Sequence, residues 1–485
     1  MLRSTLTALL MTWLTGTAFS QNLIDFHPAA TFGVGGKPAG GVLFDFTGDG
    51  SLDLAISSDN PNKIEFFANQ GDGTFGAPVA LLTGNETGPE GLAAGDFNAD
   101  GHLDLVVALF GTSSVQLVLG DGAGNFTLGP SATVGVEPSV VVTADLNGDG
   151  FVDAAVNNRV SGDMSVILNN GAGGLLSAVT YPVGDQTRCI AVGDFSGDGV
   201  PDLAVSARDS RRVRLFKNIG GGAFQIFRDL SMGSILKPQG VAMADLDGDG
   251  ALDLVTASSG TTPGQEHPSV FLQNNGGRPN IWVGPVNGTA LPGVEPTGIA
   301  AADFDLDGLI DVATANAATN NVSANKNGGI GIFTIPNVFA VGSNPSIQVL
   351  LTGDIDRNGA PDLVTINEDS EDVSVLLNRM QGTVSVRSPN PGRGPHLLHP
   401  ASPNPLTSST SLDFDLPVAA SVHMAIYDVT GRSVRTLERR ALAAGRHRVT
   451  WDGTADHGGQ LPAGVYLARL SAGDRVETQR IVLAR

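Results

Sequence analysis

Residues 245–254 read DLDGDGALDL, and this stretch decides the fold of the chain. Asp245, Asp247 and Asp249 stand at alternate positions before a glycine, as in the first half of an EF-hand calcium loop. The second half differs, because position 12 is Thr256 instead of the bidentate Glu, and an Asp stands at position 9. The flanking residues alternate in polarity and include β-branched side chains. The stretch is therefore predicted to be a calcium-type loop between two β-strands, not between two helices.

The nine-residue pattern of this loop occurs seven times, with starts at residues 45, 96, 145, 194, 245, 303 and 354. The spacing between starts lies between 49 residues (96 to 145) and 58 residues (245 to 303). Positions 1 and 9 are always Asp, position 6 is always Gly, and position 5 is Asp except for one Asn. Position 3 always carries a side-chain oxygen, whereas position 7 varies freely. A fixed period of this length indicates a repeat architecture.

Calcium fits the chemistry of these positions. It takes six to eight oxygen ligands at about 2.3–2.6 Å from carboxylates, amides, hydroxyls and carbonyls. Positions 1, 3, 5 and 9 offer side-chain oxygens, position 7 offers a backbone carbonyl, and Gly permits the tight turn. Magnesium prefers fewer protein ligands and zinc prefers His or Cys. The alternative is an acidic turn without metal, but seven copies favour up to seven Ca²⁺.

The predicted ligands, loop by loop, are Asp45, Thr47, Asp49, Ser51 and Asp53; Asp96, Asn98, Asp100, His102 and Asp104; Asp145, Asn147, Asp149, Phe151 and Asp153; Asp194, Ser196, Asp198, Val200 and Asp202; Asp245, Asp247, Asp249, Ala251 and Asp253; Asp303, Asp305, Asp307, Leu309 and Asp311; and Asp354, Asp356, Asn358, Ala360 and Asp362.

Short apolar strands surround each loop. In the second copy GLAAGDF (91–97) precedes the loop acids and LDLVVALF (103–110) follows them, and a third strand, a Gly-rich turn and a more polar fourth strand complete the unit. Four strands in about fifty residues form one blade of a β-propeller. The seventh copy stops after its third strand at 372–378, while AATFGVG (29–35) has no unit of its own. We predict that this segment completes the seventh blade and closes the ring.

The units resemble FG-GAP/VCBS repeats and are similar to the calcium-bearing blades of integrin α-subunit propellers. GDGTFGAP (71–78) and the loop pattern carry the resemblance, which covers about residues 25–380. It implies a seven-bladed propeller with calcium loops. It does not specify a function, because such blades serve adhesion proteins, lectins and accessory modules of enzymes. Integrins use the loop in only some blades, so its presence in all seven indicates a structural role here.

The composition agrees with this interpretation. The chain has 485 residues, of which 41% are hydrophobic, and a formal net charge of −21. The loop positions hold 23 of the 49 acidic residues, and seven Ca²⁺ would bring the net charge to about −7. An acidic chain of this kind is not expected to bind nucleic acid.

The chain begins with MLRSTLTALLMTWLTGTAFS (1–20), which has the pattern of a secretory signal peptide cleaved between Ser20 and Gln21. A membrane anchor is the alternative, but the apolar run at 6–14 is short for a span. The mature protein is therefore expected to be secreted or on a bacterial cell surface, without a transmembrane span. The single Cys189 excludes an intramolecular disulfide and is expected to be a small buried side chain.

The propeller is predicted to span 21–380, and a Pro- and Gly-rich linker follows at 381–402. Short alternating strands in 403–485 predict a small antiparallel β-sandwich, so the fold class is all-β. YDVTGRSVRTL (427–437) and the terminal RIVLAR resemble the Ig-like domains of flagellar hook-capping proteins and type IX secretion sorting domains. The resemblance implies contact with a secretion machinery; a plain spacer is the alternative.

No catalytic pattern emerges from the sequence. Each acid singled out above already has a metal role, and H-E-x-x-H, G-x-S-x-G and phosphate-loop motifs are absent. We therefore expect no catalytic or cofactor-binding residues, and a non-catalytic adhesion or interaction module for an unknown extracellular protein or glycan. A lectin and an accessory module of an extracellular enzyme are the alternatives. The longer fifth repeat, 260–292 with Trp282, is the expected special surface, unless it is an insertion without consequence.

Overall fold

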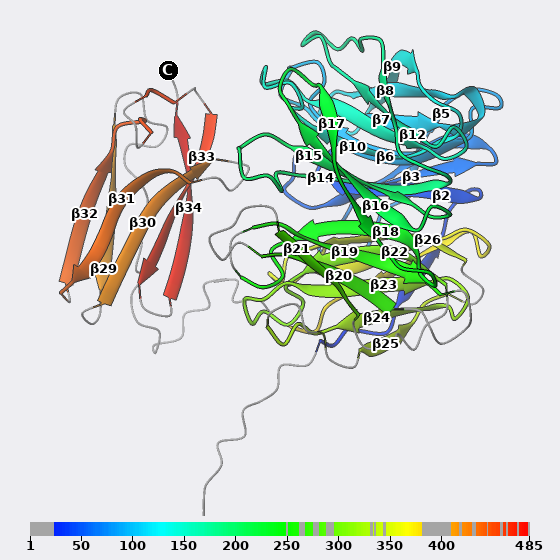
Figure 1. Cartoon of the computed structure of the whole chain (residues 1–485). Coiled ribbons are helices and arrows are strands. Elements are labelled where there is room, and N and C mark those ends of the chain that lie inside the picture. Colours follow the sequence, from blue (N-terminus) through cyan, green and yellow to red (C-terminus); the bar gives the residue numbers. More distant parts are fainter. Residues whose placement is uncertain are drawn as a thin grey trace, which may run out of the picture. The chain divides into compact units, whose positions relative to one another are not determined.

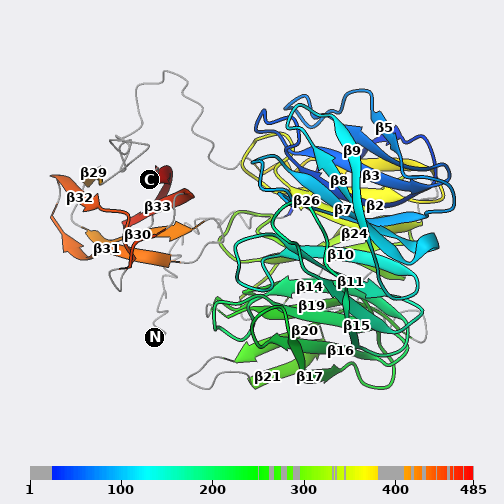
Figure 2. The same cartoon turned by 90° about the horizontal axis from the view of Figure 1, so that it is seen from above.

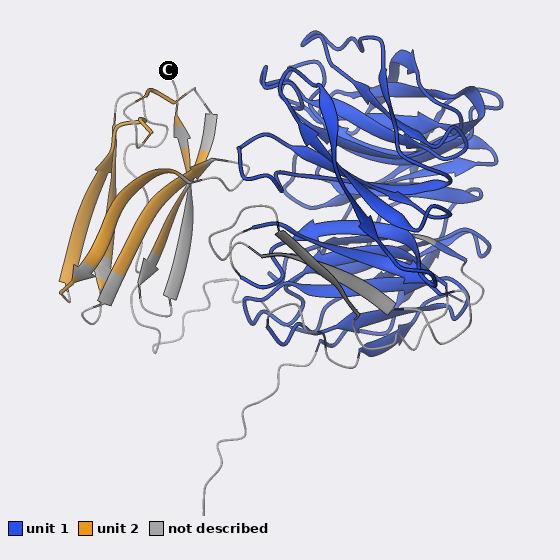
Figure 3. Cartoon of the chain, viewed as in Figure 1, with its two compact units in different colours: residues 1–384 blue, residues 385–485 orange. Residues whose placement is uncertain are grey.

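A computed structural model of the whole chain divides it into two compact units, residues 1–384 and 385–485 (Figure 3). The structure describes residues 24–248, 251–260, 267–274, 281–287, 295–329, 333, 336–342, 346–380, 409–416, 420–428, 433–443, 445–455, 459–461, 464–472 and 475–483. The predicted signal peptide and linker, and the predicted ligand Asp249, lie outside these residues.

Unit 1 consists of seven four-stranded antiparallel sheets, which are the blades of a propeller (Figures 1 and 2). Blade 1 comprises β2 (Pro38–Phe44), β3 (Asp53–Asp59), β4 (Asn62–Phe67) and β5 (Val79–Leu82). Blade 2 comprises β6 (Pro89–Gly95), β7 (Asp104–Leu109), β8 (Ser114–Gly120) and β9 (Phe126–Thr133), with the 3-10 helix η1 (Phe110–Thr112). Blade 3 comprises β10 (Pro138–Ala144), β11 (Asp153–Asn158), β12 (Asp163–Ile167) and β13 (Val179–Pro182). Blade 4 comprises β14 (Thr187–Gly193), β15 (Asp202–Ala207), β16 (Arg212–Asn218) and β17 (Phe224–Ser231).

The remaining three blades have the same order. Blade 5 comprises β18 (Lys237–Ala244), β19 (Asp253–Ser259), β20 (His267–Asn274) and β21 (Ile281–Asn287). Blade 6 comprises β22 (Pro296–Ala302), β23 (Asp311–Asn316), β24 (Asn321–Asn325) and β25 (Asn337–Ala340). Blade 7 comprises β26 (Ile347–Gly353), β27 (Asp362–Asn367), β28 (Asp372–Leu376) and, from the start of the chain, β1 (Ala30–Gly33).

The ring is closed as the sequence predicts. β1 pairs antiparallel with β28, with Ala30 opposite Val375 and Gly33 opposite Asp372. The first strands β2 and β26 also contact each other, so blades 1 and 7 are neighbours. The prediction that residues 29–35 supply the fourth strand of the seventh blade is therefore confirmed, and the sheet gains a paired edge at that point.

Burial distinguishes the strands within a blade. The second strands are buried along almost their whole length, and β7 and β15 at every residue, because neighbouring sheets cover both of their faces. The fourth strands, such as β5 and β13, are mostly exposed. Apolar side chains fill the space between blades, as where Phe66 of blade 1 stacks on Phe126 of blade 2 with ring centroids 3.8 Å apart. Each first strand contacts the first strands of both neighbours, which places these strands around the centre of the ring.

Unit 2 contains two antiparallel sheets. β29 (Thr410–Leu416) pairs with β32 (Gly445–Trp451). The other sheet has the order β31 (Ser433–Leu442), β30 (Ala420–Asp428), β33 (Gly464–Ala472) and β34 (Arg475–Leu483). One buried cluster containing Phe414, Met424, Trp451 and Tyr466 draws on both sheets. This confirms the predicted small β-sandwich.

Among the described residues of both units, no helix has the length and apolar character that crossing a bilayer requires.

Candidate metal loops

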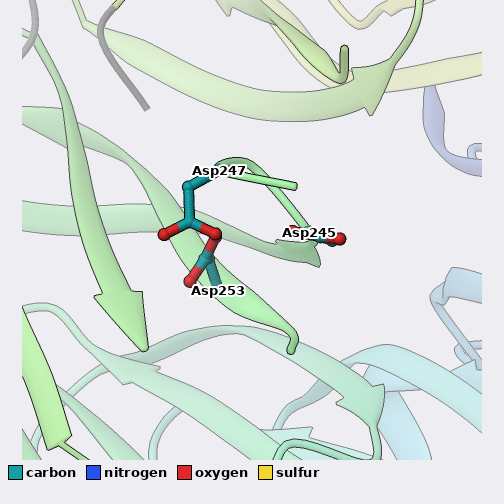
Figure 4. Close-up of side chains that lie close together, drawn as sticks. All are labelled: Asp245, Asp247 and Asp253. Atoms are coloured by element: carbon teal, nitrogen blue, oxygen red, sulfur yellow. The ribbon is translucent and has the colours of Figure 1, made fainter. Parts of the chain in front are cut away.

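Each predicted loop connects the first and second strands of a blade. The loop at 245–253, for example, begins directly after β18 and ends at the first residue of β19. Figure 4 shows Asp245, Asp247 and Asp253 gathered at this point, and one oxygen of each lies within 4.8 Å of those of the other two. Asp354, Asp356 and Asp362 form the equivalent group at positions 1, 3 and 9, whereas Asp303, Asp305 and Asp307 form a group at positions 1, 3 and 5. The structure therefore brings predicted ligands of three loops together as acidic clusters.

The turn explains the invariant glycine. At position 6 the backbone angle φ is +86° at Gly50, +91° at Gly150 and +92° at Gly308, a region that favours residues without a Cβ atom. The position-1 carboxylate holds this turn by accepting backbone N–H bonds. Asp45 accepts from Gly48 (2.8 Å) and Asp49 (3.1 Å) at Oδ1 and from Gly50 (2.8 Å) at Oδ2.

Position 9 has a structural task that the sequence did not reveal. Asp53 is fully buried, and its Oδ2 accepts hydrogen bonds from the N–H groups of Phe46 and Thr47, both at 3.1 Å. Its Oδ1 accepts from the N–H of Asn69 on the third strand's end, at 2.8 Å. The carboxylate thus ties the loop to the blade. Asp104, Asp153, Asp202, Asp311 and Asp362 have the same two-sided arrangement.

Burial of the position-9 carboxyl groups disfavours their ionised form. Burial raises the pKa of Asp153 and Asp202 to about 6 and that of Asp311 and Asp362 to about 7. Neighbouring loop carboxylates raise these pKa values further, while the backbone N–H donors oppose the shift. A cation in the loop would favour the ionised carboxylates.

These pKa shifts predict how the calcium-free protein responds to pH. In the folded state the buried acids titrate near pH 6–7, whereas an unfolded Asp titrates near pH ~4. The folded state therefore binds more protons in this window, and the contribution of these acids to stability falls as pH rises from about 4 to 7. Urea unfolding in a chelator at pH 5 and pH 7.5 should show higher stability at pH 5. Equal or lower stability at pH 5 would contradict the predicted role of burial.

Two position-1 oxygens of the described loops are buried without a hydrogen-bond partner, which is uncommon in folded proteins. They are Oδ1 of Asp96 and Oδ1 of Asp354. A buried unsatisfied polar group costs about 1–3 kcal/mol. Because the orphaned atoms are oxygens at predicted ligand positions, they fit a hard cation such as Ca²⁺.

The loops are not equivalent in charge. In loop six the ammonium of Lys326 contacts Asp305 and lies 2.8 Å from Oδ2 of Asp307. In loop four Nζ of Lys217 lies 3.0 Å from Oδ2 of Asp198. Neither lysine lies within the loop pattern, so the pattern alone does not identify them.

Contacts also join neighbouring loops. The guanidinium of Arg357 in loop seven donates to the carbonyl oxygen of Asp49 in loop one, at 2.8 Å. It also lies 3.2 Å from Oδ1 of Asp49. Arg357 stands at position 4, which has no ligand role in the loop pattern, and its contact joins blades 7 and 1.

Two further expectations concern Cys189 and the longer fifth repeat. Cys189 is partly buried, packs against the apolar cluster of blades 4 and 5, and is the only cysteine of the chain. In the longer fifth repeat, the structure describes the strands β20 and β21. The side chain of Trp282 and the residues between these strands lie outside the described part.

Comparison with known protein families matches both units. The FG-GAP-like repeat matches residues 45–107, 96–156, 145–205, 204–256 and 303–365. The FlgD Ig-like domain matches residues 404–475. The first family covers more than half of the chain, so the resemblances to FG-GAP repeats and to a hook-capping Ig-like domain are confirmed.

Solved structures with a similar fold are distant in sequence. A chain from the crystal structure of BBS1N in complex with ARL6DN, soaked with lead, is 13% identical, with a TM-score of 0.50 over 75% of this chain and 99% of that chain. A protein from Lactobacillus plantarum is 16% identical, with a TM-score of 0.48 over 63% of this chain and 86% of that chain. The comparison with curated proteins gave no match. At these identities the likeness concerns the fold alone.

Proposed function

Because the chain belongs to the FG-GAP-like repeat family, we propose that its β-propeller is a calcium-stabilised, non-catalytic interaction module that works outside the cell. The family indicates a propeller interaction module, and such propellers and Ig-like domains are typically non-catalytic. Calcium binding is the specific part of the proposal. The orphaned buried oxygens at loop position 1, Oδ1 of Asp96 and of Asp354, are the observation that supports it.

Calcium would act as a structural clamp in this proposal. Each loop lies between the first and second strands of its blade, and position 9 already ties the loop to the end of the third strand. An ion that binds the folded loop and not the unfolded chain stabilises the fold by about 2.7 kcal/mol at a hundredfold excess over its Kd. Up to seven such loops would make the stability of the ring depend on extracellular calcium.

The partner in this proposal is an extracellular protein or glycan, and export requires the two ends of the chain. Residues 1–20 would direct secretion, and the FlgD-like Ig domain would contact a secretion machinery or serve as a spacer. The mass of the exported protein distinguishes these roles. A product that starts at Gln21 supports the signal peptide, and loss of 403–485 supports a removable sorting domain.

Metal analysis of residues 21–485, together with unfolding in the presence and absence of a chelator, tests the calcium part of the proposal. Several bound Ca²⁺ per chain are expected. A protein that binds none after equilibration with millimolar Ca²⁺, and that unfolds at the same temperature with a chelator, would refute it.

A further inference from the structure

Two blades carry a lysine at the same place beside the metal loop. Lys217 and Lys326 each stand directly before an Asn whose N–H binds the position-9 carboxylate, Asn218 to Asp202 at 2.8 Å and Asn327 to Asp311 at 2.7 Å. In blades 1, 2, 3 and 7 the same place is occupied by Ala68, Leu119, Leu168 and Leu377.

The two lysines meet different carboxylates. Lys326 contacts Asp305 at position 3, whose side chain is fully buried, and Asp307 at position 5. Lys217 contacts only Asp198 at position 5, whose side chain is 39% exposed. A buried carboxylate requires a partner charge, whereas an exposed one does not. Lys326 therefore contacts two predicted calcium ligands of loop six, one of them buried. Lys217 contacts a single, exposed predicted ligand of loop four.

The orphaned oxygens also distinguish loop six from other loops. Oδ1 of Asp96 in loop two and Oδ1 of Asp354 in loop seven stay buried without a partner. In loop six no side-chain oxygen of residues 303–311 is buried without a hydrogen-bond partner. Loop six thus has its positive charge and its hydrogen bonds supplied by the protein itself.

We propose that the ammonium of Lys326 takes the place of the calcium ion in loop six, so that this blade is held without metal while loop four keeps its calcium site. The inference rests on the proposed calcium function of the other loops. It assigns at most six Ca²⁺ to the chain, in place of the seven that the loop count suggests. Lysine suits this role because its ammonium is a compact charge on a flexible stem.

Calcium counting on matched variants tests this assignment. Residues 21–485 are stripped with a chelator, dialysed against millimolar Ca²⁺, and analysed by elemental mass spectrometry as wild type, Lys326→Met and Lys217→Met. Met retains the apolar stem and removes the charge. Lys326→Met is expected to bind one more Ca²⁺ than wild type, and Lys217→Met the same number as wild type. Lys326→Gln provides a second variant if Met disturbs folding.

The outcomes separate the inference from the proposed function. Calcium bound by wild type with no gain in either Lys326 variant would overturn the role of Lys326 and leave the calcium proposal standing. A gain in Lys217→Met equal to that in Lys326→Met would overturn the distinction between the loops. No calcium in any protein would refute the proposed function itself.

A second observation, independent of the loops, concerns the other end of the first strands. These strands surround the centre of the ring and end at the metal loops, so they begin on the opposite face. Six of the first strands have a proline, or Thr187 in β14, at or near their start, and the structure describes the side chain of the next residue. This next residue is polar in five of the six strands. These residues are Ala39, Glu90, Ser139, Arg188, Gln239 and Thr297.

Arg188 and Glu90 are the two charged residues of this set. Neither has an ion pair or side-chain hydrogen bond in the described part of the chain, and Nε of Arg188 is buried without an acceptor. Two charged neighbours do have ion pairs, Arg159 with Glu137 at 3.1 Å and Arg208 with Asp209 at 3.3 Å, although Nε of Arg208 is also buried without an acceptor. A partly buried guanidinium without a carboxylate is costly for the fold.

Arg188 also lies between two other arginines. Asn157 Nδ2 donates to Thr187 Oγ1 at 3.2 Å, which places the turn bearing Arg159 beside the start of β14. The N–H of Arg208 donates to the carbonyl of Gln186 at 3.0 Å on the other side. Burial, followed by repulsion from Arg159 and Arg208, lowers the pKa of Arg188, and the charges of Asp209 and Glu90 oppose the shift. Because Arg159 and Arg208 have ion pairs, Arg188 is the guanidinium of the three that is open to an anion.

We infer that Arg188 is the centre of a binding site for a carboxylate or a tetrahedral oxyanion at this mouth of the ring, and that Glu90 faces a hydrogen-bond donor of the same ligand. A guanidinium binds both kinds of anion through paired N–H donors. Burial raises the pKa of Glu90 to about 7, with the charge of Arg159 opposing the shift, which agrees with an acid that has no ion pair among the described residues. The site goes beyond the proposed function, because it names the ligand chemistry of the propeller.

Calorimetric titration with succinate and with sulfate tests the site on calcium-equilibrated residues 21–485. Wild type is expected to bind one anion per chain, and Arg188→Gln at least tenfold more weakly. Arg228→Gln, which removes the same charge from an exposed position of β17, is the control and should bind like wild type. Arg188→Gln should also keep or raise the thermal midpoint, because the lost guanidinium has no partner.

Unchanged binding in Arg188→Gln, or an equal loss in Arg228→Gln, would overturn the site. A fall of several degrees in the midpoint of Arg188→Gln without a change in anion binding would show a structural role instead.

Discussion

Removal of calcium is expected to lower the thermal midpoint of residues 21–485 by about 20 °C, because each occupied loop contributes about 2.7 kcal/mol at a hundredfold excess of calcium over its Kd. The loops act on one cooperative ring, since each lies between two strands of a blade and neighbouring blades share their apolar cores. The orphaned Oδ1 atoms of Asp96 and Asp354 would have no partner in the metal-free protein.

Scanning calorimetry with and without EDTA, and with Ca²⁺ restored, measures this effect. Magnesium at the same concentration is the control, because its stricter octahedral geometry suits these loops poorly and should restore little of the midpoint. A thermal midpoint that EDTA does not change would contradict a stabilising role of calcium. The loop aspartates would then be candidates for another function.

Replacement of a position-9 aspartate is expected to be the most destabilising single change in a loop. Asp53→Ala leaves the N–H groups of Phe46, Thr47 and Asn69 without their acceptor in a buried place. At about 1–3 kcal/mol for each unsatisfied group, partly relieved by relaxation, the loss of unfolding free energy should be about 4 kcal/mol. The loss should persist in EDTA, because the bonds are made to the backbone and not to a metal.

Asp49→Ala is the matched control from the same loop. The side chain of Asp49 is 52% exposed, and its role in the proposal is that of a calcium ligand. Its replacement should reduce stability with calcium present and have little effect in EDTA. Urea unfolding of both variants in both conditions distinguishes the two roles, and equal behaviour of Asp53→Ala and Asp49→Ala would contradict the structural task of position 9.

The fold could be predicted because its signals are periodic and local. The left-handed turn at Gly50 and the pairing of β1 with β28 follow from a repeated glycine and from counting strands. The site could be predicted only in part. The sequence cannot distinguish an Asp53 that binds a metal from one that accepts a hydrogen bond from the N–H of Asn69. Lys326 follows a different strand of the blade, so the loop pattern does not contain it. The contact of Arg357 with Asp49 joins residues 308 positions apart, which no spacing rule connects.

The pairing of β1 with β28 also determines when the ring can close during folding. The first strand of the propeller has no sheet to join until β28, its last strand, is available, so the ring cannot close before residues 372–376 have been synthesised. Blades 1 to 6 draw all their strands from consecutive segments, and only the seventh must wait for both ends of the propeller. The propeller thus remains an open arc with one exposed sheet edge until its final blade arrives, and closure itself marks a complete propeller, with the strands of unit 2 still to follow along the chain.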